Sequence, residues 1–158
     1  MEKVLIAVDF SDVTGKVVDE GVKFAEAFGA SVCLMHTEPP NEGYIYYDAG
    51  YSSMGSLGYM NEIDPELEKS HQERIKSDKH SLQVLKDIVE KRGIETSTFL
   101  IEGNISKAII KQVDDNNYNL VVIGNHRHGK LYKFLFDDIS THLLTKTTCP
   151  VLVVPTDK

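Results

Sequence analysis

Near its start the chain reads Val4-Leu5-Ile6-Ala7-Val8-Asp9-Phe10-Ser11-Asp12, a continuous apolar run that ends in a polar turn. Beyond the turn, apolar residues recur at helical spacing, at Val18, Val22, Ala25 and Phe28. We expect Ser11 or Asp12 to cap a helix here and Gly29 to end it. The next strand-like run is Ser31 to Thr37. A short right-handed crossover of this kind leaves two strands parallel.

The same alternation of strand-like runs and helical periods continues to the end of the chain. Three more strands are predicted, Ile94 to Ile101, Asn119 to Ile123 and Val151 to Val154. The pattern as a whole is typical of an α/β protein, with a doubly wound parallel sheet that carries helices on both faces.

Three further helices are predicted between the strands. The first is entered at Asp64-Pro65-Glu66 and ends at Gly93, and the polar residues of its first half predict a solvated face that projects from the domain. Its apolar stripe consists of Ile75, Leu82, Leu85 and Val89. The second helix is capped by Asn104, and the third runs from about Asp138 through Lys146.

An irregular insert, Glu38 to Ile63, interrupts the alternation with four glycines, five tyrosines and no Lys or Arg. Loops of this length are typically functional or disordered, which leaves two alternatives. The insert is either a mobile acidic loop or a lid or partner-contact segment that carries the tyrosines. In both cases we expect about Pro40 to Asn61 to be less ordered than the sheet.

The length, composition and charge of the chain limit its number of domains and the kinds of partner it can have. The 158 residues, 41% of them apolar, are enough for one domain over residues 1–158 with a single core. A formal charge of −7 argues against nucleic-acid partners. The first residues enter a strand directly, and no apolar run approaches the roughly 20 residues that span a bilayer. We therefore expect a cytoplasmic protein without a membrane partner.

The cysteines and histidines do not form a metal-ligand pattern. Cys33 and Cys149 lie in or beside predicted buried strands and are expected to be structural thiols. His126 and His128 share a loop without an acidic or cysteine triad nearby, so no metal site is predicted there.

That loop follows the apolar run Leu120 to Ile123 and reads Gly124-Asn125-His126-Arg127-His128-Gly129-Lys130-Leu131-Tyr132-Lys133-Phe134-Leu135-Phe136-Asp137-Asp138-Ile139. Together with the first strand and turn, the run Gly29 to His36 and the final Cys149 to Pro155, it resembles the universal stress protein family. The resemblance implies the adenine nucleotide alpha hydrolase-like fold, a five-stranded sheet in the order 3-2-1-4-5, and a homodimer formed through Val151 to Val154.

In this family the loop reads G-x2-G-x9-G-[ST], and its glycines let backbone amides approach a nucleotide's phosphates. Only Gly124 matches that pattern, because Arg127, Asp137 and Asp138 occupy the other three positions. Two carboxylates would lie where the terminal phosphates meet bare amides, although a magnesium ion would reduce their repulsion. Asp138 also has a structural interpretation, since aspartate at an N-cap accepts the free amides of a helix.

Ligands of open parallel sheets bind where the strand order reverses, here between the first and fourth strands. The candidate positions, which apply only if a nucleotide binds, are Asp9, Phe10, Ser11, Thr37, Gly124, Asn125, Arg127, Gly129 and Asp138, with His36 beside Thr37. By resemblance, the residues of the first turn contact adenosine in nucleotide-binding members. Asp9 has an equally weighted alternative, because aspartate caps strand-to-helix turns in many folds.

The resemblance predicts a stress-response module that is not an enzyme, acts as a dimer through contacts with an unidentified protein partner, and does not bind ATP or another cofactor. The alternative is a switch of the same family that binds ATP or AMP with Mg. A small hydrolase ranks below both, because Ser140, Thr141 and His142 are adjacent on one predicted helix and their side chains diverge.

Overall fold

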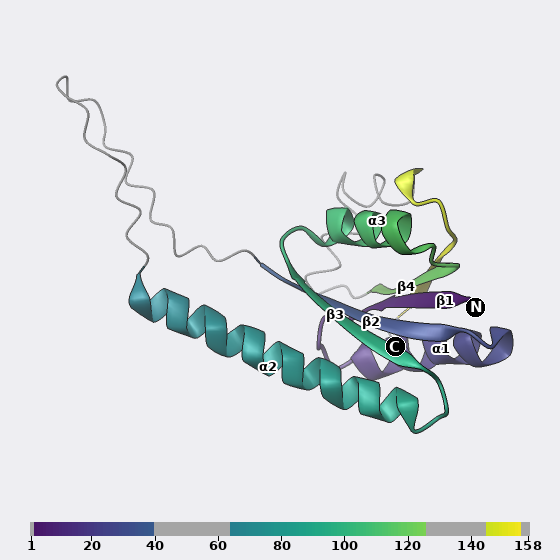
Figure 1. Ribbon diagram of the computed structural model, residues 1–158, viewed down its shortest axis with the longest axis horizontal. Coiled ribbons are helices and arrows are strands. Elements are labelled where there is room, and N and C mark those ends of the chain that lie inside the picture. Colours follow the sequence, from purple (N-terminus) through teal and green to yellow (C-terminus); the bar gives the residue numbers. More distant parts are fainter. Residues whose placement is uncertain (1, 40–63, 126–144, 156–158) are drawn as a thin grey trace, which may run out of the picture.

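The computed structural model describes residues 2–39, 64–125 and 145–155. Its elements follow one another as β1 (Lys3–Ala7), α1 (Thr14–Phe28), β2 (Ser31–Glu38), α2 (Pro65–Glu90), β3 (Thr96–Glu102), α3 (Ile105–Asn116), β4 (Leu120–Asn125) and β5 (Val151–Pro155). The strands form one sheet in the order β3-β2-β1-β4-β5, and every neighbouring pair is parallel (Figure 1). This confirms the predicted strand order.

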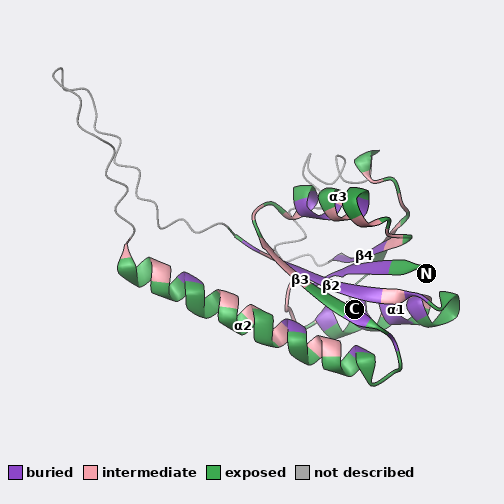
Figure 2. Cartoon of the chain, in the orientation of Figure 1, coloured by how far each residue is buried: buried purple, intermediate pink, exposed green. Residues whose placement is uncertain are grey.

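Helices cover both faces of the sheet. α1 and α2 lie on one face and α3 on the other (Figure 1). Successive side chains of β1 alternate between the two layers: Ile6 packs with the α1 and α2 side chains, whereas Leu5 packs with those of α3. Burial on both sides explains why the central strands are continuously apolar in sequence (Figure 2).

Helix α1 packs closely on the middle of the sheet. Its Gly21 faces Ile6 and Val122, two residues that pair across β1 and β4. Gly29 ends the helix as predicted, with a φ of 62° and its amide donating to the carbonyls of Ala25 and Glu26. Phe28 was expected on the apolar face, but it is 62% exposed because it lies in the last turn, beyond the edge of the core.

The predicted N-cap of α1 is wrong. Val13 occupies the N-cap position, and no side chain makes a cap hydrogen bond there. The chain first makes a turn in which the Thr14 amide donates to the Ser11 carbonyl. Ser11 lies two residues before this N-cap, and its amide and hydroxyl donate back to Asp9, which orients its side chain toward that carboxylate.

Helix α2 begins as predicted and is 26 residues long, which corresponds to about 39 Å at 1.5 Å per residue. The Asp64 carboxylate accepts the Glu66 amide, and Pro65 occupies the first turn. The helix ends at Glu90, three residues before the expected Gly93. Arg92 then forms hydrogen bonds of 2.9 and 3.0 Å to the carboxylate of Glu26 on α1.

The first half of α2 extends past the sheet (Figure 1), but it is not the wholly solvated face that was expected. His71 is buried, with Nε2 at 3.1 Å from Glu102 at the end of β3. Arg74 Nε donates to Glu38 at the end of β2, over 2.7 Å. The polar ends of two strands therefore hold this part of the helix.

Helix α3 is capped by Asn104 as predicted, because its side-chain oxygen accepts from the amides of Ser106 and Lys107. Glu38 was assigned to the irregular insert, but it is the last residue of β2 and is buried. Pro40 to Asn61 and most of the expected helix at 138–146 lie outside the described residues; Thr145 and Lys146 are helical.

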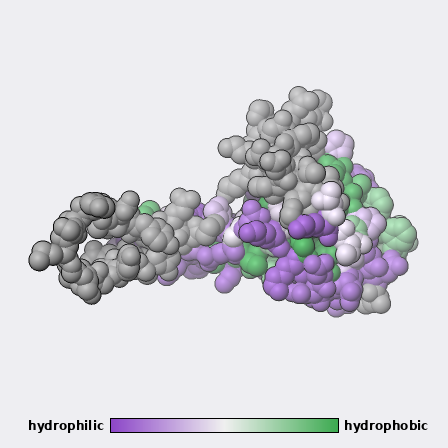
Figure 3. Space-filling model, turned by 90° about the horizontal axis from the view of Figure 1, so that it is seen from above, coloured by the Kyte–Doolittle hydropathy of each residue, from purple (hydrophilic) through white to green (hydrophobic). Residues whose placement is uncertain are grey.

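The surface shown in Figure 3 is largely hydrophilic, with apolar side chains in small patches. Within the described ranges, no helix is both long and apolar enough to cross a membrane. Cys33 and Cys149 are free thiols, the first buried and the second half-buried. Burial raises the pKa of the Cys149 thiol, which disfavours the reactive thiolate, in line with a structural role.

Candidate functional site

The candidate site lies at the carboxyl edge of the sheet, where the chain leaves β1 and β4. The chain proceeds from β1 outward to β2 and β3, and then returns to β4 and β5 on the other side. The crossovers on the two sides of this point diverge, which leaves a crevice beyond the strand ends. Asp9, Phe10 and Ser11 follow β1 at this place, and Gly124 and Asn125 end β4.

Asp9 organises the turn between β1 and α1. Its Oδ1 accepts three hydrogen bonds, from the Ser11 amide at 3.1 Å, the Ser11 hydroxyl at 2.7 Å and the Thr14 hydroxyl at 3.2 Å. The turn-capping interpretation of Asp9 therefore has a direct structural basis. All three bonds end on Oδ1. Asp9 also lines the two larger cavities described below.

Phe10 has a strained backbone. Its φ is 56°, in the left-handed region that costs a residue with a Cβ about 1–2 kcal/mol. The aromatic ring lies against His36, with the ring centroids 4.4 Å apart. Phe10 therefore covers one side of the His36 imidazole and forms part of the wall between the first turn and β2.

Thr37 and Asp9 share a small cavity of about 190 Å³ at the end of β2. The lining residues are Val8, Asp9, His36, Thr37, Pro39, Gly103, Asn104 and Ile105. Gly103 adopts a φ of 129°, which favours glycine, and its amide donates to the Glu38 carbonyl over 2.9 Å. This cavity brings residues of the first turn and the second strand together, as the candidate set requires.

Gly124 lies on the other side of the same turn. It is buried beside Asp9, Thr14 and Val17 around a gap of about 10 Å³, room for a single water at most. The structure thus brings Asp9 and Gly124 together. Arg127, Gly129 and Asp138 lie outside the described residues, as do the histidines of the loop.

A larger cavity of about 450 Å³ opens between β2 and α2. Its walls include Asp9 and Phe10 from the turn, His36 and Glu38 from β2, and Arg74 and Asp78 from α2. Sequence reasoning missed this polar wall because Glu38 was assigned to the insert and Asp78 was not considered as a site residue. The available signal was the His36-Thr37-Glu38 alternation, which puts two ionisable side chains on one face of a strand.

Comparison with known proteins gives one consistent result. The family model for the universal stress protein family matches residues 1–155. The universal stress protein YxiE of Bacillus subtilis is 24% identical, over 96% of this chain and 97% of that protein. The solved structure of MJ0577 from Methanocaldococcus jannaschii aligns with a TM-score of 0.73 at 18% identity, over 99% of this chain and 97% of that one.

A further solved structure, an Arabidopsis thaliana member with AMP bound, aligns with a TM-score of 0.60 at 15% identity, over 99% of this chain and 93% of that one. These structural alignments agree with the adenine nucleotide alpha hydrolase-like fold that the resemblance implied.

Proposed function

The chain belongs to the universal stress protein family, and we propose that it is a regulatory module of that family that catalyses no reaction, does not bind ATP, and acts as a dimer through contacts with another protein. The observation that carries this proposal is the contrast between the two halves of the site. The adenosine half keeps Asp9 and Gly124 side by side at the strand ends, and Asp9 also lines a cavity of about 190 Å³. The phosphate half carries Arg127, Asp137 and Asp138 at the positions of two glycines and a Ser or Thr.

The electrostatic argument against ATP rests on Asp137 and Asp138. Like charges about 4 Å apart repel by roughly 4 kcal/mol each at an effective dielectric near 20. One such contact corresponds to about three decades of affinity. Arg127 would attract phosphate through its charge, but its side chain occupies space where a glycine lets backbone amides approach. The repulsion acts on the terminal phosphates, so it weighs less on adenosine or AMP.

The geometry around Asp9 also supports a role without catalysis. A serine nucleophile needs a histidine base within hydrogen-bond reach, and that histidine needs an orienting partner. Here the Ser11 hydroxyl donates to Asp9, while His36 Nδ1 lies 2.7 Å from the Val8 carbonyl. The Ser11 hydroxyl is directed at a carboxylate that holds the turn and not at an imidazole, which favours a structural role for Ser11.

A switch controlled by an adenine monophosphate is the second candidate. The cavity of about 190 Å³ beside Asp9 and Thr37 lies below the roughly 300–1,000 Å³ of typical ligand pockets, so it would hold one part of AMP, such as the adenine or the ribose, and leave the rest outside. The AMP-bound Arabidopsis thaliana member shows that this fold holds such a ligand. In this form of the proposal AMP, and not ATP, would control assembly.

Calorimetry with ATP and AMP on the purified chain tests the proposal. We expect no heat from ATP at about 10–100 µM, whereas Arg127→Gly, Asp137→Gly and Asp138→Ser together should strengthen ATP binding by about 1,000-fold. A charge-matched control, Lys107→Gln, Asp114→Asn and Asp87→Asn at exposed helix positions, should leave ATP binding absent. Micromolar ATP binding by the unmodified chain, tighter than that of AMP, would refute the proposal.

Dimerisation is expected through β5, which is an edge strand of the sheet. Its Val153 is 38% exposed, and an exposed apolar edge invites pairing with a second copy, limited in length by Pro150 and Pro155. Light scattering at micromolar concentration should give the mass of a dimer, and Val153→Lys should give a monomer. Val84→Lys, at a valine 44% exposed on α2, should stay dimeric. A monomeric unmodified chain contradicts this prediction.

A further inference from the structure

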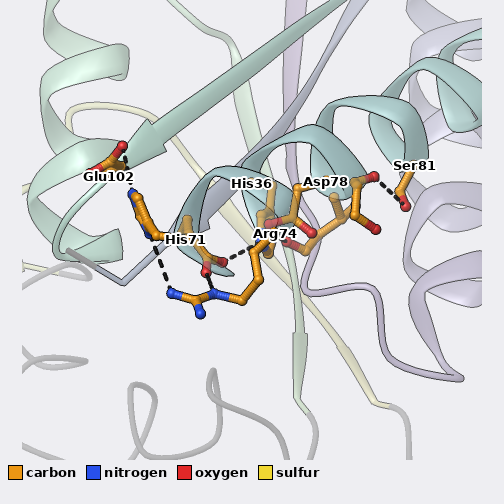
Figure 4. Close-up of polar contacts among 9 residues, drawn as sticks. His36, His71, Arg74, Asp78, Ser81 and Glu102 are labelled. Carbon is orange, nitrogen blue, oxygen red and sulfur yellow. Dashed lines mark hydrogen bonds and ion pairs between the residues drawn. The ribbon is translucent and has the colours of Figure 1, made fainter. Parts of the chain in front are cut away.

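Three ionisable side chains converge on the larger cavity from β2 and α2 (Figure 4). His36 and Glu38 are two residues apart on one face of β2, and Asp78 comes from the facing side of α2. One ligand-type atom of each side chain lies within 4.8 Å of the others. Their side chains are 7%, 5% and 17% exposed, so the cluster is largely withdrawn from water.

The hydrogen bond at His36 Nδ1 determines which ring nitrogen of the imidazole faces the two carboxylates. Nδ1 lies 2.7 Å from the Val8 carbonyl oxygen, which only accepts, so Nδ1 carries the proton of that bond. Nε2 is therefore directed at the two carboxylates. An imidazole that donates Nδ1–H to a backbone carbonyl and presents Nε2 is a typical metal-ligand arrangement.

The distances suit a shared cation better than direct hydrogen bonds. Nε2 is 3.5 Å from Asp78 Oδ2 and 3.9 Å from Glu38 Oε2, beyond the usual range of about 2.7–3.2 Å. Two ligand atoms about 2.1 Å from a tetrahedral metal lie about 3.4 Å apart. The edge from Nε2 to Asp78 is thus within about 0.1 Å of that separation, and the edge from Nε2 to Glu38 is about 0.5 Å longer than it. All three ligand atoms lie within 4.8 Å of one another, so a bound metal would draw the two carboxylates together.

Arg74 holds the Glu38 carboxylate in place. Its Nε donates to Glu38 Oε1 over 2.7 Å, while Oε2 is the oxygen that faces His36. Partners of this kind orient a ligating carboxylate without contacting the metal. Phe10 covers the imidazole on another side, at 4.4 Å between ring centroids. The cluster therefore has an inner set of three ligands and a supporting shell around it.

We propose that His36 Nε2, Glu38 Oε2 and Asp78 Oδ2 bind a divalent first-row transition metal, with its remaining coordination positions open to the cavity of about 450 Å³. One imidazole nitrogen and two carboxylate oxygens suit Zn²⁺, Mn²⁺, Fe²⁺ or Co²⁺, whereas Mg²⁺ and Ca²⁺ prefer oxygen ligands alone. The site goes beyond the proposed function, because it lies between β2 and α2 and needs no nucleotide.

Cobalt titration of the full chain, without a polyhistidine tag and after treatment with a chelator, tests this site. Co²⁺ is both the ligand and the spectroscopic probe. We expect saturation at one ion per chain, with visible d–d absorption that reports an ordered, protein-ligated ion. Zn²⁺ should displace it, in keeping with the order of metal affinities. His36→Gln and Asp78→Asn should each weaken Co²⁺ binding by about 100-fold or more, whereas Mg²⁺ should not compete.

His80→Gln is the matched control, because His80 lies at an exposed position of the same helix as Asp78. It should keep the affinity and the spectrum of the unmodified chain. Circular dichroism and thermal unfolding establish that each variant folds. Absence of stoichiometric Co²⁺ or Zn²⁺ binding overturns the proposal. Binding of equal strength in His36→Gln and Asp78→Asn also overturns it, because the ion then sits elsewhere.

Discussion

Replacing Leu82 by alanine is expected to lower the free energy of unfolding by about 3 kcal/mol, within the range measured for buried leucines. Leu82 is 2% exposed and belongs to the core between α2 and the sheet. Alanine would remove its methyl groups and leave a cavity that the surrounding strands fill only in part. The same change loosens the helix that carries Arg74 and Asp78. Urea denaturation monitored by circular dichroism measures the effect.

Leu67→Ala is the control for this prediction. Leu67 lies on the same helix and is 47% exposed, so its removal should change stability by no more than about 0.5 kcal/mol. Equal losses in the two variants would mean that α2 does not pack through Leu82.

The second large effect is expected at Gly21 in α1. A Cβ at this position would lie 2.5 Å from Ile6 Cδ1 and 2.9 Å from Ile6 Cγ1, closer than real contacts. Ile6 is fully buried in β1 and has little room to move. Overpacking lowers the free energy of unfolding by about 1–3 kcal/mol, whereas the higher helix propensity of alanine raises it by up to about 1 kcal/mol. We expect Gly21→Ala to destabilise the protein by about 2 kcal/mol at most, and Gly21→Val by more.

A double-mutant cycle identifies the cause. Ile6→Val removes Cδ1, the atom at 2.5 Å, and alone should cost about 0.5–1.5 kcal/mol. In the Gly21→Ala background the same change should be nearly neutral, because it relieves the clash, giving a coupling of about 1 kcal/mol. If the stability losses of the two single variants simply add in the double variant, the clash with Ile6 is not the cause, and α1 shifts as a whole to make room for the Cβ.

The sheet could be predicted from sequence because its information is local. Each strand contains a short apolar run, although β3 begins with three hydroxyl residues, and each helix has a 3.6-residue period. Asp64, Asn104 and Gly29 mark helix ends with their own side chains or backbone. The failure at the start of α1 has a local cause too. Ser11 is a good capping residue, but its hydroxyl is oriented toward Asp9 two positions earlier, whereas a cap needs the serine oxygen to face the helix amides.

The candidate site could be predicted only in part, for a different reason. Asp9 to Ser11 and Gly124 lie at strand ends, which the alternation of elements locates. The pairing of Glu38 with Arg74, and of His36 with Asp78, depends on how far α2 slides along β2. That register is set by packing of Leu82 and Val89 against the sheet, a contact between residues far apart in the chain. No local periodicity in the sequence indicates the register of α2 along β2.

For protein engineering, the left-handed backbone of Phe10 is a strained position that should not be relaxed. Glycine would adopt the same φ without the strain of a Cβ, but it would remove a ring that packs against the core and would raise the conformational entropy of the unfolded chain. The His36 imidazole, whose centroid lies 4.4 Å from that ring, would also lose its cover. A design procedure that replaces every residue of positive φ by glycine would therefore damage both the core and the pocket of this protein.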